Sequence, residues 1–577
     1  MNCSTRFKLT TVALLVGSAM NANAALYKVV EVDPALNGSS STYNDAYGVA
    51  IQQGDVAFET GCFANGANCT DDQFKLALET RVSVDGVSYR EELPFAMDAT
   101  FGYIQEFDDF ERYCYNELRY STCETWASIH WAPWYKELSK DYTSNALAFV
   151  EKDLDAGEEE PNAYQNKYNN VINSLTSSGL PVGNQSVLKD DKTDLETRNT
   201  VVAPVTPQGD FYQSRAWKTD GTYTVGSVSS KTGNENGTHY TSKAAIWDAA
   251  GVVKQLDWPQ VADRDGERLA QGSMRDVVVD DKGDTDPAND IIYGVGYNTY
   301  LDDNYINASV FVGTFDSGGG ALKDSTWRSK AVVNAEMKNS SGDIIHSNSV
   351  VTNVNSNFIA IGEAKRAGGK PSEGSAANRL FLVKDVRAES VSATFLPELG
   401  GIFFSGAGGK MGGINKYNEI VGQLDAEDTR EIDGKPRRKR GFILPYYDEK
   451  TSTPTPERRA IFNNKAWYLD DLTNGSNAPV ENNQYRIIDA TDINDAGVIS
   501  ATAIKCEGGY DTTAHNSYCG EGSQEEKVVA VKLIPIANAD ANDIEKRPVE
   551  KAAAERSGAG LGWLSLTLLV LFGFRRK

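Results

Sequence analysis

Five carboxylates stand close together between residues 280 and 290: Asp280, Asp281, Asp284, Asp286 and Asp290. Calcium takes six to eight oxygen ligands, and alternating Asp and Asn residues around a glycine turn can supply them. The spacing differs from the EF-hand pattern, in which acidic positions are followed by a glycine and a distal glutamate. We therefore expect a solvated acidic turn, and calcium is the one cofactor for which the sequence offers a candidate site.

Four aromatic residues lie within ten positions of one another: Trp126, Trp131, Trp134 and Tyr135. Exposed Trp and Tyr rings favour binding surfaces, and such rings can stack on sugars or on a partner protein. The alternative interpretation is that these rings form the small core of a helical insertion. The cluster is the candidate ligand-binding site of the chain.

Motifs for covalent or phosphate chemistry are weak. Ser317 lies in an Asp-Ser-Gly-Gly turn like that of serine proteases, but it precedes His515, whereas those proteases have the histidine first. The glycine-rich stretch Ser405–Lys410 lacks both the first glycine and the final Ser or Thr of a phosphate-binding loop. The remaining histidines, His130, His239 and His346, give a histidine-dependent mechanism few candidates. No catalytic residue is expected.

Residues 1–24 have the pattern of a secretory signal peptide. Arg6 and Lys8 form the basic start, residues 9–20 are apolar, and the small residues Ala22 and Ala24 fit the cleavage site. We expect the mature protein to begin at residue 25 and to work outside the cytoplasm.

Removal of this leader would leave six of the seven cysteines, an even number in an oxidising compartment. The six fall into three close pairs, and none has the Cys-x-x-Cys spacing of a redox or zinc site. We predict local structural disulfides between Cys62 and Cys69, Cys114 and Cys123, and Cys506 and Cys519.

The chain is acidic, with a formal net charge of −23. Loss of two cations with the leader and three with the extreme C-terminus would bring it to −28. Such a surface argues against nucleic acid as a partner and fits a soluble exported protein that meets divalent cations or neutral glycans. One basic run, Lys435–Arg440, is interpreted as a solvated hairpin loop; the alternative is a contact with anionic polysaccharide or lipopolysaccharide phosphate.

A degenerate repeat organises the chain: an aliphatic residue, Asn or Asp, a turn with glycine, and a short aliphatic run. The clearest copies are Val354–Gly362, Ile414–Gly422 and Ile493–Ala501, and looser ones begin at Ala50 and Val279. Asn, Asp and Gly supply the corners of a tight turn between two strands. The copies are spaced more widely than the ~40–50 residues of a compact propeller blade. We predict an all-β fold, a six- or seven-bladed β-propeller over residues 25–537 with long loops.

One region departs from the β pattern. Residues 101–199 are charged and aromatic, with helical runs at Phe107–Leu118 and Tyr142–Leu154 and a polar stretch over 176–199. We predict an α-helical insertion within the propeller, pinned by the Cys114–Cys123 disulfide and followed by a linker that returns to the sheet.

The C-terminal end has two parts. Residues 538–557 are polar and are interpreted as a stalk. Residues 558–577 contain an apolar run that ends in three cations. At ~1.5 Å per residue the segment just crosses a ~30 Å hydrocarbon core, provided that the cations snorkel to the inner surface. We expect a transmembrane helix, which the apolar pattern alone would make an ordinary C-terminal anchor.

This tail, with its small residues, the Leu-Gly-Trp-Leu-Ser-Leu stretch and the terminal cations, resembles the Gly-Gly C-terminal sorting domain, GlyGly-CTERM. The paired glycines of that domain stand here as Gly558, Ala559 and Gly560. The resemblance implies a Gram-negative bacterium and cleavage in this region by rhombosortase, a rhomboid-like intramembrane protease. The repeats resemble those of the HAF-type exported proteins, which implies a β-propeller. Together the two features resemble an uncharacterised gammaproteobacterial exported family without an assigned activity, so no catalytic residue is implied.

These features predict an exported protein that its tail holds in the inner membrane before it reaches the cell surface or is secreted. We expect a non-enzymatic binding or structural role, with a glycan or matrix polymer as partner. The secretion machinery and a rhombosortase-like protease are the expected processing partners. The competing hypothesis is an exported hydrolase or lyase with its active site at the mouth of the propeller channel. Ionisable side chains from several blades converging there would favour it.

The sequence also predicts how the ring closes. Tyr27–Val32 and Lys527–Ile536 are the apolar, strand-like segments nearest the two ends of the mature chain. A propeller hides the edge of its first strand when both chain ends share one blade. We expect these two segments to lie in the same blade.

Overall fold

The structure is a computed structural model that describes most of residues 25–550. Residues outside the description are 1–24, 34–44, 55–60, 66–68, 82–105, 114, 116–122, 125–126, 129–130, 133–134, 136–138, 140–145, 152–167, 190–194, 235–236, 261–263, 266–267, 284, 302–303, 316–320, 339–340, 347–348, 365–377, 430–436, 448–455, 476–477 and 551–577.

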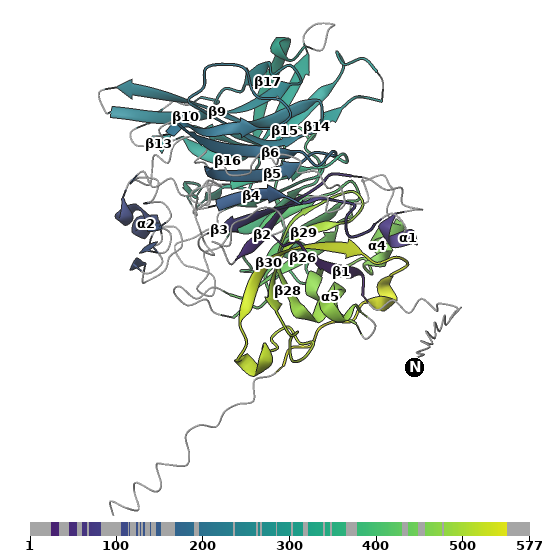
Figure 1. Ribbon diagram of the computed structural model, residues 1–577. Coiled ribbons are helices and arrows are strands. Elements are labelled where there is room, and N and C mark those ends of the chain that lie inside the picture. Colours follow the sequence, from purple (N-terminus) through teal and green to yellow (C-terminus); the bar gives the residue numbers. More distant parts are fainter. Residues whose placement is uncertain are drawn as a thin grey trace, which may run out of the picture.

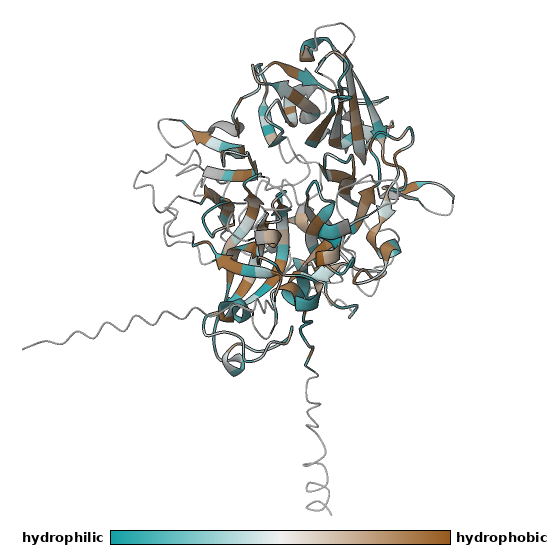
Figure 2. Ribbon diagram, turned by 90° about the vertical axis from the view of Figure 1, so that its right-hand side faces the viewer, coloured by the Kyte–Doolittle hydropathy of each residue, from teal (hydrophilic) through white to brown (hydrophobic). Residues whose placement is uncertain are grey.

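The chain forms a seven-bladed β-propeller, which confirms the predicted fold class (Figures 1 and 2). Each blade is an antiparallel meander whose first strand lies innermost, and the innermost strands follow one another around the ring. Blade 1 contains β2 (Ala46–Ile51), β3 (Leu76–Arg81) and β4 (Ala146–Val150); blade 2 contains β5 (Tyr168–Leu175), β6 (Pro181–Leu188) and β7 (Leu195–Val202); blade 3 contains β8 (Gln213–Thr219), β9 (Tyr223–Asn234), β10 (Gly237–Asp248) and β11 (Val253–Gln255).

The other four blades have four strands each. Blade 4 contains β14 (Ser273–Asp280), β15 (Ile291–Tyr300), β16 (Tyr305–Phe315) and β17 (Ser325–Ala331); blade 5 contains β20 (Ser349–Val354), β21 (Ala360–Ala364), β22 (Arg379–Val383) and β23 (Thr394–Phe395); blade 6 contains β24 (Gly409–Ile414), β25 (Glu419–Asp425), β26 (Lys439–Pro445) and β27 (Trp467–Tyr468); blade 7 contains β28 (Tyr485–Ile493), β29 (Ile499–Cys506), β30 (Glu526–Pro535) and β1 (Tyr27–Glu31).

Small elements decorate the ring. They are two short hairpins, β12 (Arg264–Asp265) with β13 (Arg268–Leu269) and β18 (Met337–Lys338) with β19 (Ile344–His346); the helices α1 (Cys62–Asn65), α2 (Phe107–Tyr113), α4 (Pro456–Ile461) and α5 (Leu469–Leu472); and the 3₁₀ turns η4 (Leu322–Asp324), η5 (Leu396–Leu399), η6 (Val480–Gln484), η7 (Gly520–Gly522) and η8 (Ala541–Asp543).

Ring closure follows the prediction. β1 is the outermost strand of blade 7 and pairs antiparallel with β30, with Tyr27 opposite Pro535 and Glu31 opposite Val531. The backbone nitrogen of Leu26 also donates to the carbonyl of Leu472 in α5, which connects blades 6 and 7, at 2.8 Å. The two ends of the propeller therefore share one blade, and that blade's apolar residues pack in one cluster with those of blade 6.

The repeated sequence motif forms the turn between the first and second strands of a blade. In three consecutive blades its asparagine, Asn355, Asn415 or Asn494, accepts hydrogen bonds from backbone nitrogens of its own turn. The residue three positions later has a positive φ: 63° at Phe358, 58° at Asn418 and 88° at Gly497. The asparagine thus satisfies the turn's amides. The left-handed corner favours Asn and Gly, which occupy it in blades 6 and 7, whereas Phe358 occupies it in blade 5.

The same asparagines tie each blade to the next. The side-chain amide of Asn355 donates to the carbonyl of Asn415, that of Asn415 to Asn494, and that of Asn494 to Gln52 in blade 1. Gln52 occupies the equivalent place in blade 1 and donates to Ser177 in blade 2. These turns form one continuous hydrogen-bonded series over five blades.

The two faces of the ring differ. The face that carries these turns, here named the turn face, also carries α1 and α4, which Figure 1 shows opposite α2. The other face, the loop face, carries the connections from second to third strands and those between blades, because antiparallel strands reverse direction at each step. Its long segments include the region around α2 and the loop between β29 and β30.

The structure corrects the predicted insertion. Phe107–Tyr113 is helical as expected, but Tyr142–Leu154 was expected to be helical and instead contains strand β4. The supposed linker 176–199 contains strands β6 and β7. Polar and charged residues in β6 and β7 obscured the β pattern there, whereas β4 is wholly apolar and short, and such a run does not distinguish a strand from a helix. The insertion that the structure describes lies between β3 and β4.

Two of the predicted disulfides are present, Cys62–Cys69 and Cys506–Cys519. Cys123 is disulfide-bonded too, while its predicted partner, Cys114, lies outside the described residues. The first bridge pins the loop that carries α1 and the second pins the loop between β29 and β30, so both act locally.

Candidate functional site

The aromatic cluster of the insertion is partly described. Trp131 and Tyr135 lie one helical turn apart, with their ring centroids 5.8 Å from each other. Below them, the ring of Phe110 in α2 meets Trp131 edge to face at 6.2 Å, and Phe110 is fully buried. Tyr135 is 55% exposed. Trp126 and Trp134 lie outside the described residues.

We name Phe110, Trp131 and Tyr135 the aromatic platform. Phe110 belongs to the core of the insertion, Trp131 is half-buried on top of it, and Tyr135 presents its ring to solvent. Each of the two interpretations made from the sequence applies to part of the cluster. Phe110 belongs to the core, and Trp131 and Tyr135 form a surface. Paired rings of this kind can stack on the apolar face of a sugar.

The acidic turn uses its carboxylates locally. Asp280 pairs with Lys282, Asp281 accepts from the nitrogen of Gly283, and Asp286 accepts from that of Ala288. Burial raises the pKa of Asp280, but the hydrogen bonds from Lys282 outweigh that effect and leave the pKa below its usual value. Asp290 ends the loop, and Asp284 lies outside the description. Among the described side chains, no group of three or more His, Cys, Asp or Glu could hold a metal ion.

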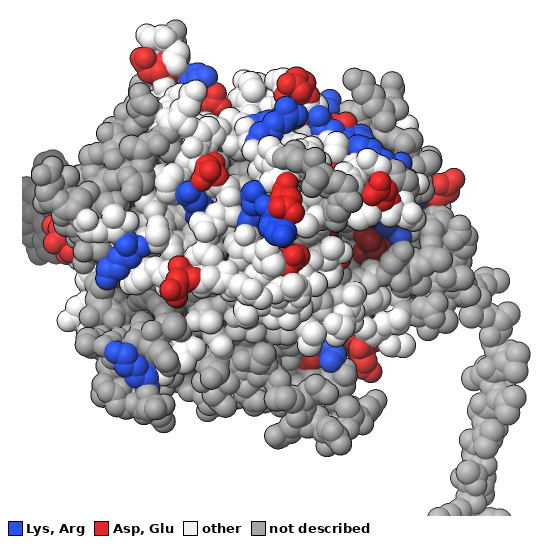
Figure 3. Space-filling model, turned by 90° about the horizontal axis from the view of Figure 1, so that it is seen from above, with Lys and Arg blue, Asp and Glu red and all other residues white. Residues whose placement is uncertain are grey.

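The basic run is neither a solvated loop nor an anion-binding patch where the structure describes it. Arg437 and Arg440 are buried, and each of the four cations from Arg437 to Arg440 has an acidic partner. On the side of the ring that holds blades 3 and 4, Lys and Arg also lie among Asp and Glu (Figure 3). Among the described residues of that side, cations and acids are therefore intermixed.

Ionisable side chains from three blades approach the ring axis. Lys218 in blade 3 donates to Asp276 in blade 4 at 3.0 Å. Burial lowers the pKa of Lys218, but Asp276 and also Asp492 and Asp495 from blade 7 raise it above its usual value. Blades 3 and 7 are not neighbours, so this coupling acts across the channel.

These carboxylates also hold the ring together. Asp276 accepts from the backbone nitrogen of Val354 in blade 5 at 3.0 Å, and Asp492 accepts from that of Ile51 in blade 1 at 3.1 Å. Burial raises the pKa of Asp492 to about 6, with the charge of Lys218 opposing the shift. Asp276 and Asp492 are thus acceptors for strands of the next blade. We name Lys218, Asp276, Asp492 and Asp495 the channel group, and we assign to it the structural role of joining blades.

The described residues that follow β30, up to residue 550, are docked on the propeller, whereas residues 538–557 were predicted to form a stalk. Asn538 donates from its backbone to Phe63, and Ala539 is buried in the core of blades 6 and 7. Residues 544–550, here named the C-terminal strap, then run past α5 to the loop between β29 and β30. A segment of polar composition is therefore part of the fold up to residue 550.

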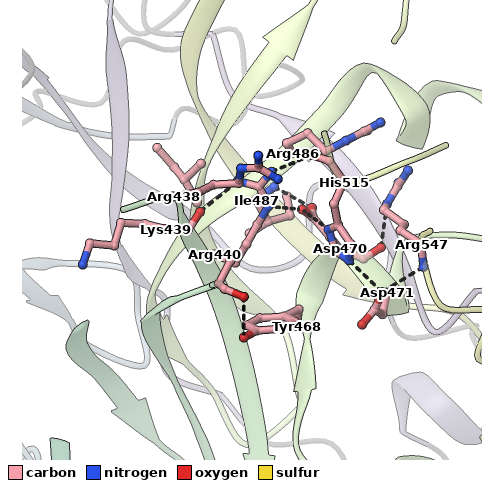
Figure 4. A network of polar contacts seen from close by, with 12 residues as sticks. Arg438, Lys439, Arg440, Tyr468, Asp470, Asp471, Arg486, Ile487, His515 and Arg547 are labelled. Carbon is pink, nitrogen blue, oxygen red and sulfur yellow. Dashed lines mark hydrogen bonds and ion pairs between the residues drawn. The ribbon is translucent and has the colours of Figure 1, made fainter. Parts of the chain in front are cut away.

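A buried polar network holds the strap (Figure 4). Arg547 donates from its backbone to the carboxylate of Asp471 at 2.9 Å and from its guanidinium to the carbonyls of Asp470 and Thr513. The backbone nitrogen of His515 donates to Pro548 at 2.9 Å. The strap is thus joined both to α5 and to the disulfide-bonded loop.

His515 stands between two carboxylates of this network. Its Nε2 lies 3.1 Å from Asp471, and its Nδ1 forms an ion pair with Asp470 at 3.6 Å. Asp470 also forms an ion pair with Arg440, at 2.8 Å. Burial lowers the pKa of His515, but Asp470 and Asp471 outweigh it and raise the pKa above its usual value. No sequence motif marked this site, because its named members come from four separate segments of the chain.

A pocket of about 320 Å³ lies on the loop face between blades 5 and 6. Its polar groups come from Arg379, Glu398 and Ser405, and its remaining walls are apolar or small: Leu380, Phe395, Leu396, Pro397, Phe403, Gly406, Ala407 and Leu424. The volume and the few convergent polar groups fit a site for a small ligand. The glycine-rich stretch that resembled a phosphate loop supplies one wall, without binding geometry of that kind.

The two termini carry the signals expected to determine where the protein is located. The signal residues Ala22 and Ala24 and the sorting residues Gly558, Ala559 and Gly560 lie outside the described part of the chain, so export and processing stay predictions. Within the described part, no helix has the length and apolar character needed to span a membrane.

Comparison with known proteins gives a family. Residues 4–208 and 225–577 match the model of a family described as "Protein of unknown function (DUF3466)". No curated protein matches the chain. Because the match covers more than half of the residues, the chain belongs to the family of unknown function DUF3466.

Proposed function

We propose that this seven-bladed propeller is an exported binding protein that recognises a glycan or matrix polysaccharide through the aromatic platform. The observation that carries the proposal is the exposed ring of Tyr135, which lies next to the ring of Trp131 at a tilt of 38°, with Trp131 in turn resting on the buried ring of Phe110. Such a surface offers rigid apolar area at low entropic cost, which sugar rings can cover.

Three further features support this role. The platform stands on the loop face, on an insertion that projects from blade 1 and leaves the ring intact. The acidic composition favours a neutral or cation-bridged glycan over a polyanion. The leader and the sorting tail expected from the sequence would bring the platform to the cell surface or the medium.

The alternative, an exported hydrolase or lyase, would use the channel group. Asp492, with its raised pKa, and Asp276 are its candidate acid and base. We favour the binding role because both carboxylates already accept hydrogen bonds from neighbouring strands. Release of reducing ends from a retained polysaccharide, abolished in Asp276→Asn, would instead support the enzyme.

The test measures how strongly a glycan array retains the mature chain. Tyr135→Ala removes an exposed ring, so it should lower retention at least tenfold with the melting temperature unchanged. Tyr518→Ala is the matched control, because Tyr518 is 67% exposed on a different loop of the same face. Equal retention by the two variants would refute the platform as the glycan site.

A further inference from the structure

The pocket between blades 5 and 6 is a second, separate site that no feature of the platform explains. Its lining comes from the start of β22, the end of β23, η5 and the segment that leads into β24, with Leu424 from β25 closing the far wall. It therefore spans two blades.

The pocket's shape is fixed by its surroundings. Behind it, Arg437 donates to the carbonyl of Gly406 at 2.8 Å, and Asp425 accepts from the nitrogen of Gly408 at 2.8 Å. Phe403 packs edge to face on Phe442, with ring centroids 5.4 Å apart. A pocket built in this way is pre-organised, and a ligand that enters it orders few additional groups.

The polar groups define the ligand's chemistry. The guanidinium of Arg379 lies 3.8 Å from the centroid of Phe395, stacked on the ring. A stacked guanidinium keeps its N–H groups in the plane, where they can meet the two oxygens of a carboxylate. Glu398 also lines the pocket, and its carboxylate accepts a hydrogen bond from the backbone nitrogen of Phe395. Because this carboxylate is negative, a ligand with one negative charge fits beside Arg379 more readily than a ligand with two.

We propose that this pocket binds a small ligand consisting of one six-membered ring with a single carboxylate. The carboxylate meets Arg379, and the ring lies among Leu396, Phe403 and Leu424. Two sources share this chemistry: a uronic acid with hydroxyls within reach of Ser405 and Glu398, or a free aromatic acid.

The experiment titrates the mature chain with D-glucuronate, benzoate and their uncharged counterparts glucose and benzyl alcohol, by calorimetry or ligand-observed NMR. At least one of the two acids should bind with a Kd below about 1 mM, as fits a ligand of about ten heavy atoms. The uncharged counterparts should bind at least tenfold more weakly. Which acid binds identifies the source.

Arg379→Gln should weaken that binding by about ten- to a hundredfold, the usual effect of losing a charge-assisted pair. Arg387→Gln is the matched control, because Arg387 also stacks on a ring of blade 5, that of Phe358 at 4.2 Å, outside the pocket. A second variant, Ala407→Leu, fills the pocket and leaves Arg379 in place, so it should also abolish binding. Failure of both acids to bind, or equal binding by Arg379→Gln and Arg387→Gln, would overturn the proposal. Glycan retention by the platform is unaffected in either case.

Discussion

Asn415 and Asn494, equivalent residues of neighbouring blades, are joined by a hydrogen bond of 3.1 Å from the side-chain amide of the first to the carbonyl of the second. Asn415 is buried, and its side-chain oxygen accepts from the nitrogens of Tyr417 and Glu419, each at 3.0 Å. One side chain therefore closes a turn and joins two blades, which gives the repeat motif a physical meaning.

Asn415→Ala should lower the free energy of unfolding by about 2–4 kcal/mol, because it leaves several buried backbone groups without a partner. Asp220→Ala is the control: Asp220 accepts from Thr222 and Tyr223 in an exposed turn and has no donor for the next blade. That variant should cost about 1 kcal/mol. Similar losses in urea unfolding for the two variants would contradict the inter-blade role.

Ring closure by β1 gives a second prediction. Val29 is buried against the core of blades 6 and 7, whereas the neighbouring Lys28 is exposed and pairs with Asp71. Val29→Asp should destabilise the whole propeller by more than about 3 kcal/mol, since it buries an unpaired charge at the closing strand. Lys28→Asp should be close to neutral. If thermal unfolding of Val29→Asp showed only local fraying, closure by this strand would not hold the ring.

The raised pKa of Asp492 makes stability depend on pH. A carboxyl whose pKa is raised to about 6 in the folded state binds its proton more tightly there than in the unfolded chain. Its stabilising contribution is complete below pH ~4 and is lost as pH rises to about 6, a change on the order of 3 kcal/mol. The difference in unfolding free energy between wild type and Asp492→Asn should therefore shift in favour of the variant over this range. A constant difference from pH 4 to 6.5 would contradict the shift.

The strap should respond to pH in a higher window. The folded-state pKa of His515 is raised, so its contribution is complete below about pH 6.5 and is lost as pH rises through the folded-state value. Hydrogen-exchange protection of residues 544–550 should fall as pH increases above neutral, after correction for the intrinsic rate. In His515→Gln this dependence should vanish. Protection that changes equally in both proteins would show that another group titrates.

Much of the fold could be predicted from the sequence, because the repeated Asn turns are local and carry their own signal. The same reasoning failed at β6 and β7, where polar and charged residues interrupt the apolar alternation, and at β4, a short apolar run that does not distinguish a strand from a helix. The strap could not be recognised either, since Arg547 is buried only because Asp470 and Asp471, far away in sequence, surround it. The pocket likewise arises where two blades meet, and only its glycine-rich wall was visible as a motif.

The most direct test of the central proposal is the affinity of the mature chain for the glycan that it retains best on an array. Calorimetry should give a Kd at least tenfold weaker for Tyr135→Ala than for wild type, as expected when a sugar loses a stacking ring worth about 1.5 kcal/mol. Tyr518→Ala should match wild type. A Kd unchanged in Tyr135→Ala, or weakened equally in both variants, would contradict recognition by the aromatic platform.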